Sequence, residues 1–407
     1  MLNVFDMFTS QDRFFEDGGN GGKRRNGERF LHPQKCESVQ DLNGDWSLTI
    51  DYIMSDKDDA WKFLKPYNII MNSQGQLFPI YSVTKKINSN GLPVLSAKAR
   101  HIFYYLNDKI VRNVNIDYYA CYWAINSIYQ NIEWGYGNDL VDYSFNYYSN
   151  LPNDFLKSAK YDGESAAYCL LGGAESIVNL YAGELYRDNF YFSINDRMEY
   201  CRENAFNLIH GWNLIEVSET TDVSEKITKL EAEDNMGHSA SIARVPDRTF
   251  PHQVLKYIKI SYSSEKESRN FNSNDPEIYE RNKAFDTDGY YIENMNANVS
   301  YDVNFQDLRN TNLAKDWQDL ERLNVGDYGT VYSQMLDIST EQRVISKTID
   351  EITGRVTKMK LGNFKPSALH ISRYEKMLNT DDSNSRRLDN VEDRLKELES
   401  REEDSDE

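Results

Sequence analysis

GELYRDNFYFSINDRMEYCRENAFNLIHGWNLIEVSETTDVSEKITKLE, residues 183–231, holds the strongest structural signals in the chain. Residues 189–194 and 213–218 alternate large apolar with polar side chains and are rich in aromatic and β-branched types, which indicates two half-buried strands. Asp222 and Ser224 precede a short periodic segment, so a turn or a helix start is expected over residues 220–230. The stretch contains no nucleophile motif, metal cluster or phosphate loop, and by itself predicts a β-rich domain.

Length and charge limit the class of protein. The 407 residues predict two or three domains. The high content of aromatic residues, with 28 Tyr and 18 Phe against 9 Pro, favours half-exposed strands over helical bundles. A net charge of −19 argues against nucleic-acid binding, which needs a basic surface. Residues 381–407 hold 12 acidic and 5 basic side chains and so contribute −7 of this charge.

The sequence shows neither a membrane span nor a secretory signal. There is no run of about 18 apolar residues, and the N-terminus lacks a basic segment followed by an apolar one. The four cysteines, Cys36, Cys121, Cys169 and Cys201, have no CxxC spacing, so free buried thiols are expected.

The first hundred residues read as short strands at regular spacing. Asn43-Gly44 is a hairpin signal, and Trp46, Leu48, Ile50 and Tyr52 alternate cleanly after it. Further strands are expected over residues 68–71, 77–85 and 92–100, which favours a sandwich or barrel. Residues 118–133 predict a helix whose core face holds Tyr122, Ile125 and Tyr129.

No pattern of a catalytic, cofactor or metal site emerges. The glycine-rich loop at residues 18–22 lacks the P-loop signature, and there is no GxSxG. A zinc peptidase motif requires two histidines within about four residues of each other, and no two of the six histidines lie that close in the sequence. His101 stands beside aromatic residues and is interpreted as a packed, hydrogen-bonded histidine. We therefore expect no catalytic residue, cofactor or metal.

Several motifs, in this order, resemble the tail-associated proteins of long-tailed phages of Gram-positive bacteria, a family often called prophage endopeptidase tail or phage minor structural protein. They are LNGDWSL at residues 42–48, QLFPIYSV at 76–83, SAKARHIFYYL at 96–106, GELYRDNF at 183–190, GWNL at 211–214, residues 222–230, and a turn-strand motif at 323–332. The resemblance covers roughly residues 1–370.

The resemblance implies an α+β, mostly β fold with two modules that resemble tail-tube β-barrels, mixed α+β insertions and a short C-terminal helix. The expected divisions are residues 1–103 for the first barrel, 104–182 for an α+β insertion, and 183–250 for the first part of the second barrel. Residues 251–297 form another insertion, residues 298–372 complete the second barrel, and residues 373–407 are an acidic helix or tail.

The last segment carries the candidate oligomer interface. Leu388, Val391, Leu395 and Leu398 follow the a/d spacing of a coiled coil, over too short a length for a stable isolated coil. One interpretation is an amphipathic helix on the surface of the body. The other is a helix gathered on a symmetry axis, because the family's hub proteins are trimeric.

The function that the resemblance implies is a structural hub of the phage tail tip or baseplate, made in the host cytoplasm and located in the virion. The hub would be a homotrimer that mates with the distal tail protein, closes the tail tube and opens for DNA ejection, with the tape measure protein and receptor-binding proteins as further partners. DNA would pass through without specific binding. The alternatives are a peptidoglycan endopeptidase and a carbohydrate-binding tip. The catalytic module of larger relatives is expected to be absent.

Overall fold

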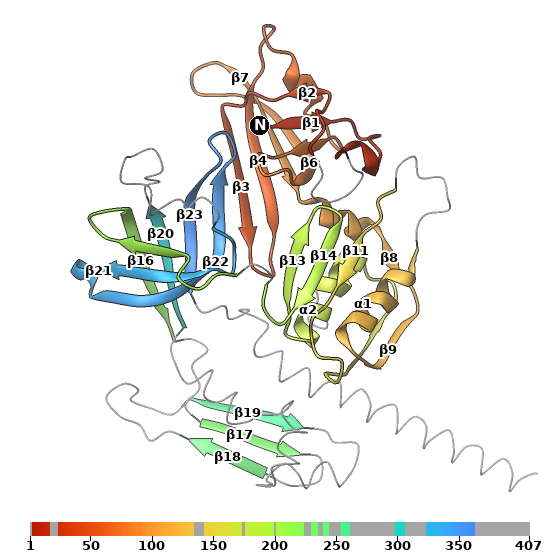
Figure 1. Cartoon of the computed structure of the whole chain (residues 1–407), viewed down its shortest axis with the longest axis vertical. Coiled ribbons are helices and arrows are strands. Elements are labelled where there is room, and N and C mark those ends of the chain that lie inside the picture. The colour runs from red at the N-terminus through yellow and green to blue at the C-terminus, as the bar shows by residue number, and fades with distance from the viewer. Residues whose placement is uncertain are drawn as a thin grey trace, which may run out of the picture. The chain divides into compact units, whose positions relative to one another are not determined.

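The computed structural model describes residues 2–16, 23–133, 142–172, 176–198, 201–223, 229–234, 239–243, 254–260, 298–305 and 323–362. The chain divides into two compact units (Figure 1). The first comprises Met1–Thr220 and Ser300–Phe364, and the second comprises Thr221–Val299 and Lys365–Glu407. Among the described residues, no helix is long and apolar enough to cross a membrane.

A 13-stranded sheet forms the framework of the first unit. Its N-terminal half has the order β3-β4-β7-β6-β5-β1-β2, and all neighbouring strands in it are antiparallel. These strands are β1 (Asn3–Phe5), β2 (Arg29–Phe30), β3 (Lys35–Asp41), β4 (Trp46–Ile53), β5 (Ile69–Met71), β6 (Leu77–Ile87) and β7 (Pro93–Arg100). Short 3₁₀ helices, η1 (Gln11–Arg13) and η2 (Ala60–Phe63), lie between them in sequence.

The other half of this sheet comes from strands far along the chain. They are β15 (Phe206–Ile209), β16 (Leu214–Asp222), β20 (Asn298–Phe305), β21 (Tyr328–Ser333), β22 (Ile338–Asp350) and β23 (Arg355–Gly362), with the 3₁₀ helix η8 (Gln334–Leu336) between β21 and β22. They continue the sheet as β16-β20-β23-β22, and β21 pairs with β22 and, in parallel, with β15. β22 pairs with β3, so the two halves share one sheet (Figure 1).

The fold is mostly β with a mixed α+β region, as predicted. The pairings among the described strands do not close either half into a barrel. The domain boundaries expected from the sequence stay a prediction.

The mixed region follows β7. It contains the 3₁₀ helix η3 (Ile102–Asp108), α1 (Cys121–Gln130), a π turn η4 (Tyr168–Gly172) and α2 (Ile177–Leu180). Its strands form small sheets: β8 (Ile110–Val111) with β10 (Ile132–Glu133), β9 (Val114–Tyr119) with β12 (Lys157–Tyr161), and β11 (Asn146–Tyr148) with β14 (Tyr191–Asn195) and β13 (Glu184–Asp188).

α1 differs in part from the helix predicted over residues 118–133. The helix is shorter than expected because β9 continues to Tyr119. Its buried face is formed by Cys121, Ala124, Ile125 and Ile128, so Ile125 was placed correctly. Tyr122 is exposed instead of buried, since the small Cys121 and Ala124 allow the helix to approach the core along their own face.

Two hydrophobic cores lie on opposite faces of β5. Ile70 packs in the core beneath β4, with Trp46, Leu48 and Ile50, whereas Ile69 and Met71 pack in the core of the mixed region. A strand buried on both faces is expected to be continuously apolar, which explains the run Ile69-Ile70-Met71. The mixed region is therefore packed directly against the sheet.

The second unit contains a three-stranded sheet. β17 (Lys229–Asp234) pairs with β18 (Ser239–Ala243) in antiparallel fashion and with β19 (Leu255–Ile260) in parallel. The sequence predicts a turn or helix start over residues 220–230; β16 extends through Asp222 and β17 begins at Lys229, so these two ends are strand, and residues 224–228 lie outside the described residues. The backbone at Asp222 is extended because β16 is a strand of the large sheet, where it pairs with β20.

Candidate functional site

Two of the motifs found in the sequence contact each other. Asn43, in the turn between β3 and β4, donates from Nδ2 to the carbonyl oxygen of Gly183 at 2.8 Å and accepts from the Leu185 N–H at 2.7 Å. Asn43 has a φ of 48°, in the left-handed region that asparagine tolerates better than most residues. The hairpin turn of the N-terminal strands is thereby fixed on the first strand of the GELYRDNF motif. We call this contact region the motif junction.

Arg187 is the buried cation of the motif junction. Its guanidinium donates to the Tyr104 hydroxyl at 3.1 Å and to the Asp41 carbonyl oxygen at 3.4 Å. It also lies over the rings of Trp46, Phe103 and Tyr104, at 5.7–5.8 Å from their centroids. Cation–π contacts of this kind strengthen when the cation is desolvated, which explains how this charge is accommodated among aromatic rings.

His101 is packed and hydrogen-bonded, as predicted. Its ring stacks on Trp46 at 4.3 Å, Nδ1 accepts from the Phe103 N–H at 3.2 Å, and Nε2 contacts the Gln76 Oε1 at 2.9 Å. Since Nδ1 accepts, Nε2 carries the proton and donates. Burial, and to a lesser extent the positive charge of Arg187, holds the pKa of His101 well below its usual value. The imidazole is therefore neutral and serves as a structural link.

The turn of the GELYRDNF motif is held by amide side chains. Gln76 donates to the Asp188 carboxylate at 2.8 Å and accepts from the Asn189 N–H at 3.2 Å. Asn189, at a φ of 48°, accepts from the Leu77 N–H at 2.9 Å and donates to the Gly75 carbonyl oxygen at 3.2 Å. These bonds dock the β13–β14 turn onto the start of β6.

A buried ion pair connects the same motif to the C-terminal strands. Arg343 on β22 donates to both carboxylate oxygens of Glu184 on β13, at 2.5 and 2.7 Å. Burial would lower the pKa of Arg343, but hydrogen bonding and attraction by Glu184 raise it. Arg343 also donates to the Gly326 carbonyl oxygen at 3.0 Å, and Glu184 accepts from the Met198 N–H at 2.6 Å. The pair is therefore fully engaged, which a buried ion pair requires to be stable.

A second buried carboxylate lies where β22 meets the N-terminal strands. Glu351 accepts from the Ser38 hydroxyl at 2.5 Å, from the Asn72 amide at 2.8 Å and from the Ser73 N–H at 3.1 Å. Nearby, Lys347 is buried and donates to the Leu323 carbonyl oxygen at 3.1 Å. Burial lowers the pKa of Lys347 to about 8.

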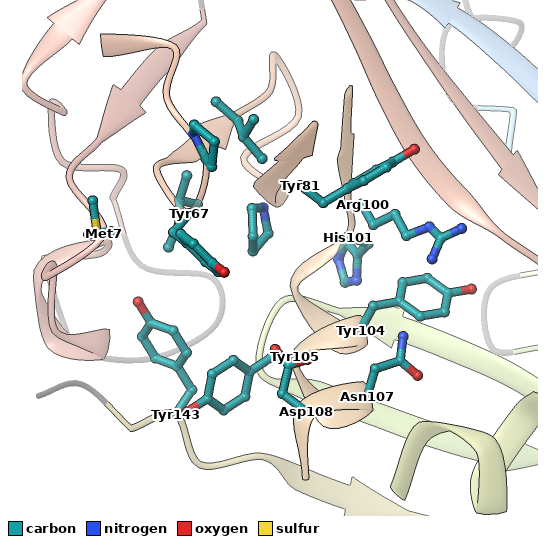
Figure 2. A pocket seen from close by; sticks show the side chains of 14 residues that line it. Met7, Tyr67, Tyr81, Arg100, His101, Tyr104, Tyr105, Asn107, Asp108 and Tyr143 are labelled. Atoms are coloured by element: carbon teal, nitrogen blue, oxygen red, sulfur yellow. The ribbon is translucent and has the colours of Figure 1, made fainter. Parts of the chain in front are cut away.

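Beside the motif junction is a tyrosine-lined pocket of about 420 Å³ (Figure 2). Arg100 lies over the rings of Tyr81 and Tyr104, at 5.1 and 5.8 Å, and pairs with Asp45 at 3.6 Å. On the opposite side, Tyr105 and Tyr143 meet edge to face at 5.1 Å. The pocket is lined by Met7, Pro66, Tyr67, Ile69, Pro79, Ile80, Tyr81, Arg100, His101, Tyr104, Tyr105, Asn107, Asp108 and Tyr143.

Two phenols of this pocket, those of Tyr105 and Tyr143, stay protonated near neutral pH. Burial raises the pKa of Tyr105 to about 12 and also raises the pKa of Tyr143. The pocket therefore offers flat apolar walls with hydroxyl groups that donate and accept, which suits the insertion of a side chain or a short peptide segment.

The described residues show no group of three or more His, Cys, Asp or Glu side chains that could hold a metal ion. His32 and His210 are exposed, and His238, His252 and His370 lie outside the described residues. The four cysteines are free. Cys36, Cys121 and Cys169 are buried as expected, whereas Cys201 is half-buried. Burial raises the pKa of all four thiols, to about 12 for Cys121 and Cys169, so none is an activated thiolate.

Leu388, Val391, Leu395 and Leu398, the candidate oligomer interface, lie outside the described residues. Sequence reasoning missed the Glu184–Arg343 pair and the Glu351 cluster. The sequence does show charged residues within strand patterns, but such a pattern does not reveal which residue each charge pairs with.

No protein-family model and no curated protein matches the sequence. Solved structures do match. Prophage tail protein gp18 from Listeria monocytogenes EGD-e has a TM-score of 0.54 at 14% identity, over 93% of this chain and 99% of that chain. The prophage MuSo2 43 kDa tail protein from Shewanella oneidensis has a TM-score of 0.54 at 13% identity, over 86% and 98%. The chain has the fold of prophage tail proteins. A tail protein from Neisseria meningitidis MC58 matches similarly, with a TM-score of 0.53 at 13% identity over 91% and 98%.

Proposed function

We propose that the chain is a structural protein of a phage tail, located at the tail tip or baseplate. The observation that carries this proposal is the fold likeness to two prophage tail proteins and a third tail protein, which extends over at least 86% of this chain and at least 98% of each of the others. A likeness of this extent concerns the whole arrangement of sheet and mixed region, rather than one common supersecondary motif.

The motif junction supports a structural role. A component of a tail tip must keep its shape under load, and the buried and half-buried contacts of Asn43, Arg187, Glu184 and Glu351 connect three segments of the chain. Polar networks that are hydrogen-bonded inside a fold rigidify it. The guanidinium NH groups of Arg187 and the carboxylates of Glu184 and Glu351 bond within the chain, although the buried Nε of Arg187 has no hydrogen-bond partner.

In detail, we propose a homotrimeric hub that mates with the distal tail protein, closes the tail tube and opens for DNA ejection. Two modules per chain would give three copies six similar surfaces, and cyclic symmetry is the ordinary way to close such a ring. Leu388, Val391, Leu395 and Leu398 would gather the three C-terminal segments. The net charge of −19 would let DNA pass without binding it. The tape measure protein and receptor-binding proteins are further proposed partners, and no catalytic module is proposed.

The test is the mass of the purified chain by light scattering, alone and with the distal tail protein of the same virion. The full chain is compared with a truncation after residue 378 and with a variant in which Leu388, Val391, Leu395 and Leu398 are all replaced by serine. The matched control replaces four polar neighbours, Asp389, Glu392, Arg394 and Glu397, by serine.

We expect a species of three times the mass of the chain, weakened by the truncation and by the apolar substitutions but not by the control. Co-elution with the distal tail protein is expected for the trimer. A chain that stays monomeric at high concentration and does not bind the distal tail protein would overturn the proposal.

A further inference from the structure

A groove of about 520 Å³ runs along α1, apart from the motif junction and the tyrosine pocket. Its aromatic side chains are unusually exposed: 59% for Tyr118, 58% for Trp123 and 39% for Tyr119. The groove is lined by Tyr118, Tyr119, Ala120, Trp123, Asn126, Ser127, Gln130, Asn131, Asn153 and Leu156. Exposed aromatic side chains gathered in one depression mark an interaction site more often than scattered ones do.

The backbone holds these aromatic groups toward solvent. Trp123 belongs to the side of α1 that Cys121, Ala124, Ile125 and Ile128 leave outside the core. Tyr118 has a φ of 52°, a left-handed conformation that a bulky side chain rarely adopts. Local strain of this kind, with an exposed aromatic ring as its result, is more frequent at functional sites than in ordinary loops.

The polar part of the lining is neutral. None of the ten lining residues is charged, although 27% of the whole chain is. The Asn126 Oδ1 accepts from the Tyr147 hydroxyl at 2.8 Å, and the Asn131 amide donates to the Ser127 carbonyl oxygen at 2.8 Å. These two bonds orient amide groups at the groove. Each amide has both a donor and an acceptor end, so the lining suits a ligand with many neutral hydroxyl groups.

We propose that the α1 groove binds a neutral carbohydrate. The apolar C–H face of a pyranose ring would stack on Trp123 and Tyr118, and its hydroxyl and acetamido groups would bond to the amides of Asn126, Gln130 and Asn153. A phosphorylated or acidic polymer and a nucleic acid both need cations that the lining lacks. An acidic chain attracts basic protein partners, but no residue that lines the groove has a carboxylate that could pair with a basic side chain.

The proposal is tested by calorimetric titration of the full-length chain with three probes. Tetra-N-acetylchitotetraose represents the sugars of glycan strands, maltoheptaose represents neutral hexose polysaccharides, and poly(glycerol phosphate) represents anionic polymers. Trp123→Ala removes one stacking ring, and Tyr118→Gly removes the other while easing the left-handed backbone. The control is Trp212→Ala, which removes a tryptophan that is 47% exposed outside the groove.

Binding of at least one of the two neutral oligosaccharides is expected. Each groove variant should weaken it by about tenfold or more, the scale of one lost aromatic stacking contact, while Trp212→Ala should change it by less than about twofold. Unchanged thermal unfolding of the Tyr118→Gly variant would show that weaker binding does not reflect a damaged fold.

Which neutral probe binds distinguishes acetamido sugars from plain hexoses. The proposal is overturned if neither neutral probe binds, if only the anionic polymer binds, or if the groove substitutions leave binding unchanged. A chain that binds no sugar but loses self-association or a protein complex on Trp123→Ala would also overturn the proposal, because the groove would then be a protein interface. Because the assay uses no tail component, its outcome is independent of the proposed hub function.

Discussion

Replacement of Asn43 by alanine measures how strongly the motif junction stabilises the first unit. Alanine removes two hydrogen bonds, to the Gly183 carbonyl oxygen and from the Leu185 N–H, each with a net contribution of about 1 kcal/mol. It also places a residue without a polar side chain at a φ of 48°, which costs about 1 kcal/mol more. The expected loss in free energy of unfolding is therefore about 3 kcal/mol.

Asn43→Gly separates these two contributions. Glycine loses the same hydrogen bonds but accepts the left-handed backbone, so its expected loss is about 2 kcal/mol. Urea unfolding followed by tryptophan fluorescence, with Trp46 beside the junction, measures both variants, and the Asn43→Ala midpoint should fall by about 1 M or more. Asn90→Ala, in the β6–β7 hairpin loop, is the control, with an expected change below about 0.5 kcal/mol. Equal losses for Asn43→Gly and Asn43→Ala, or a loss below about 1 kcal/mol for alanine, would refute the reasoning.

Three further predictions concern buried groups. Glu184→Gln should lower the free energy of unfolding in urea by about 3 to 5 kcal/mol, because it leaves the Arg343 charge buried without a counter-ion. Replacing both Glu184 and Arg343 by methionine should cost less than Glu184→Gln alone, and a larger loss for the double variant would contradict this reasoning. The pKa of Lys347 falls from its ordinary 10.5 to about 8 in the folded chain. Burial of the charged amine therefore lowers the free energy of unfolding by its full amount below pH 8, and this loss shrinks to zero as the pH rises from 8 to about 10.5. Lys347→Met should therefore be the more stable protein at pH 7, and the advantage should shrink between pH 8 and 10.5; a constant difference across that range would argue against the lowered pKa. Gly329→Ala should destabilise by about 1 to 3 kcal/mol, since its Cβ would lie 2.4 Å from the Phe206 carbonyl oxygen of the paired strand, and an unchanged melting temperature would show that β15 can move away.

Local patterns predicted the strands well. Trp46, Leu48, Ile50 and Tyr52 alternate in sequence and are all buried, and the Asn43-Gly44 turn lies where the hairpin signal placed it. The period of a strand is a property of its own residues, so it can be read without knowledge of the partner. The face of α1 was harder to predict, because an aromatic helix offers apolar residues on more than one side. Only the packed structure decides that small residues face the core and Tyr122 does not.

The long-range contacts of the buried carboxylates Glu184 and Glu351 could not be predicted in the same way. Glu184 and Arg343 are separated by 159 positions, and Ser38 and Glu351 by 313. With 65 acidic and 46 basic residues in the chain, composition gives no means of choosing the pairs. The histidine interpretation succeeded because a neighbouring residue, Phe103, does bond to His101. Its other partners, Trp46 and Gln76, and the Arg187 cation over the Trp46 ring come from elsewhere in the chain and could not be read from the local sequence.

The pairing of β3 with β22 also has a consequence during synthesis of the chain. At roughly 5 to 20 residues per second, the ribosome needs about 15 to 60 s to make the 313 residues that separate Ser38 from Glu351. Throughout that interval the outer edge of β3 has no partner strand, and an open edge invites pairing with other nascent chains. Lys35 and Glu37 place charges along this edge, which is a known means of discouraging such pairing. The N-terminal strands must therefore stay soluble as an incomplete sheet until the last strands arrive.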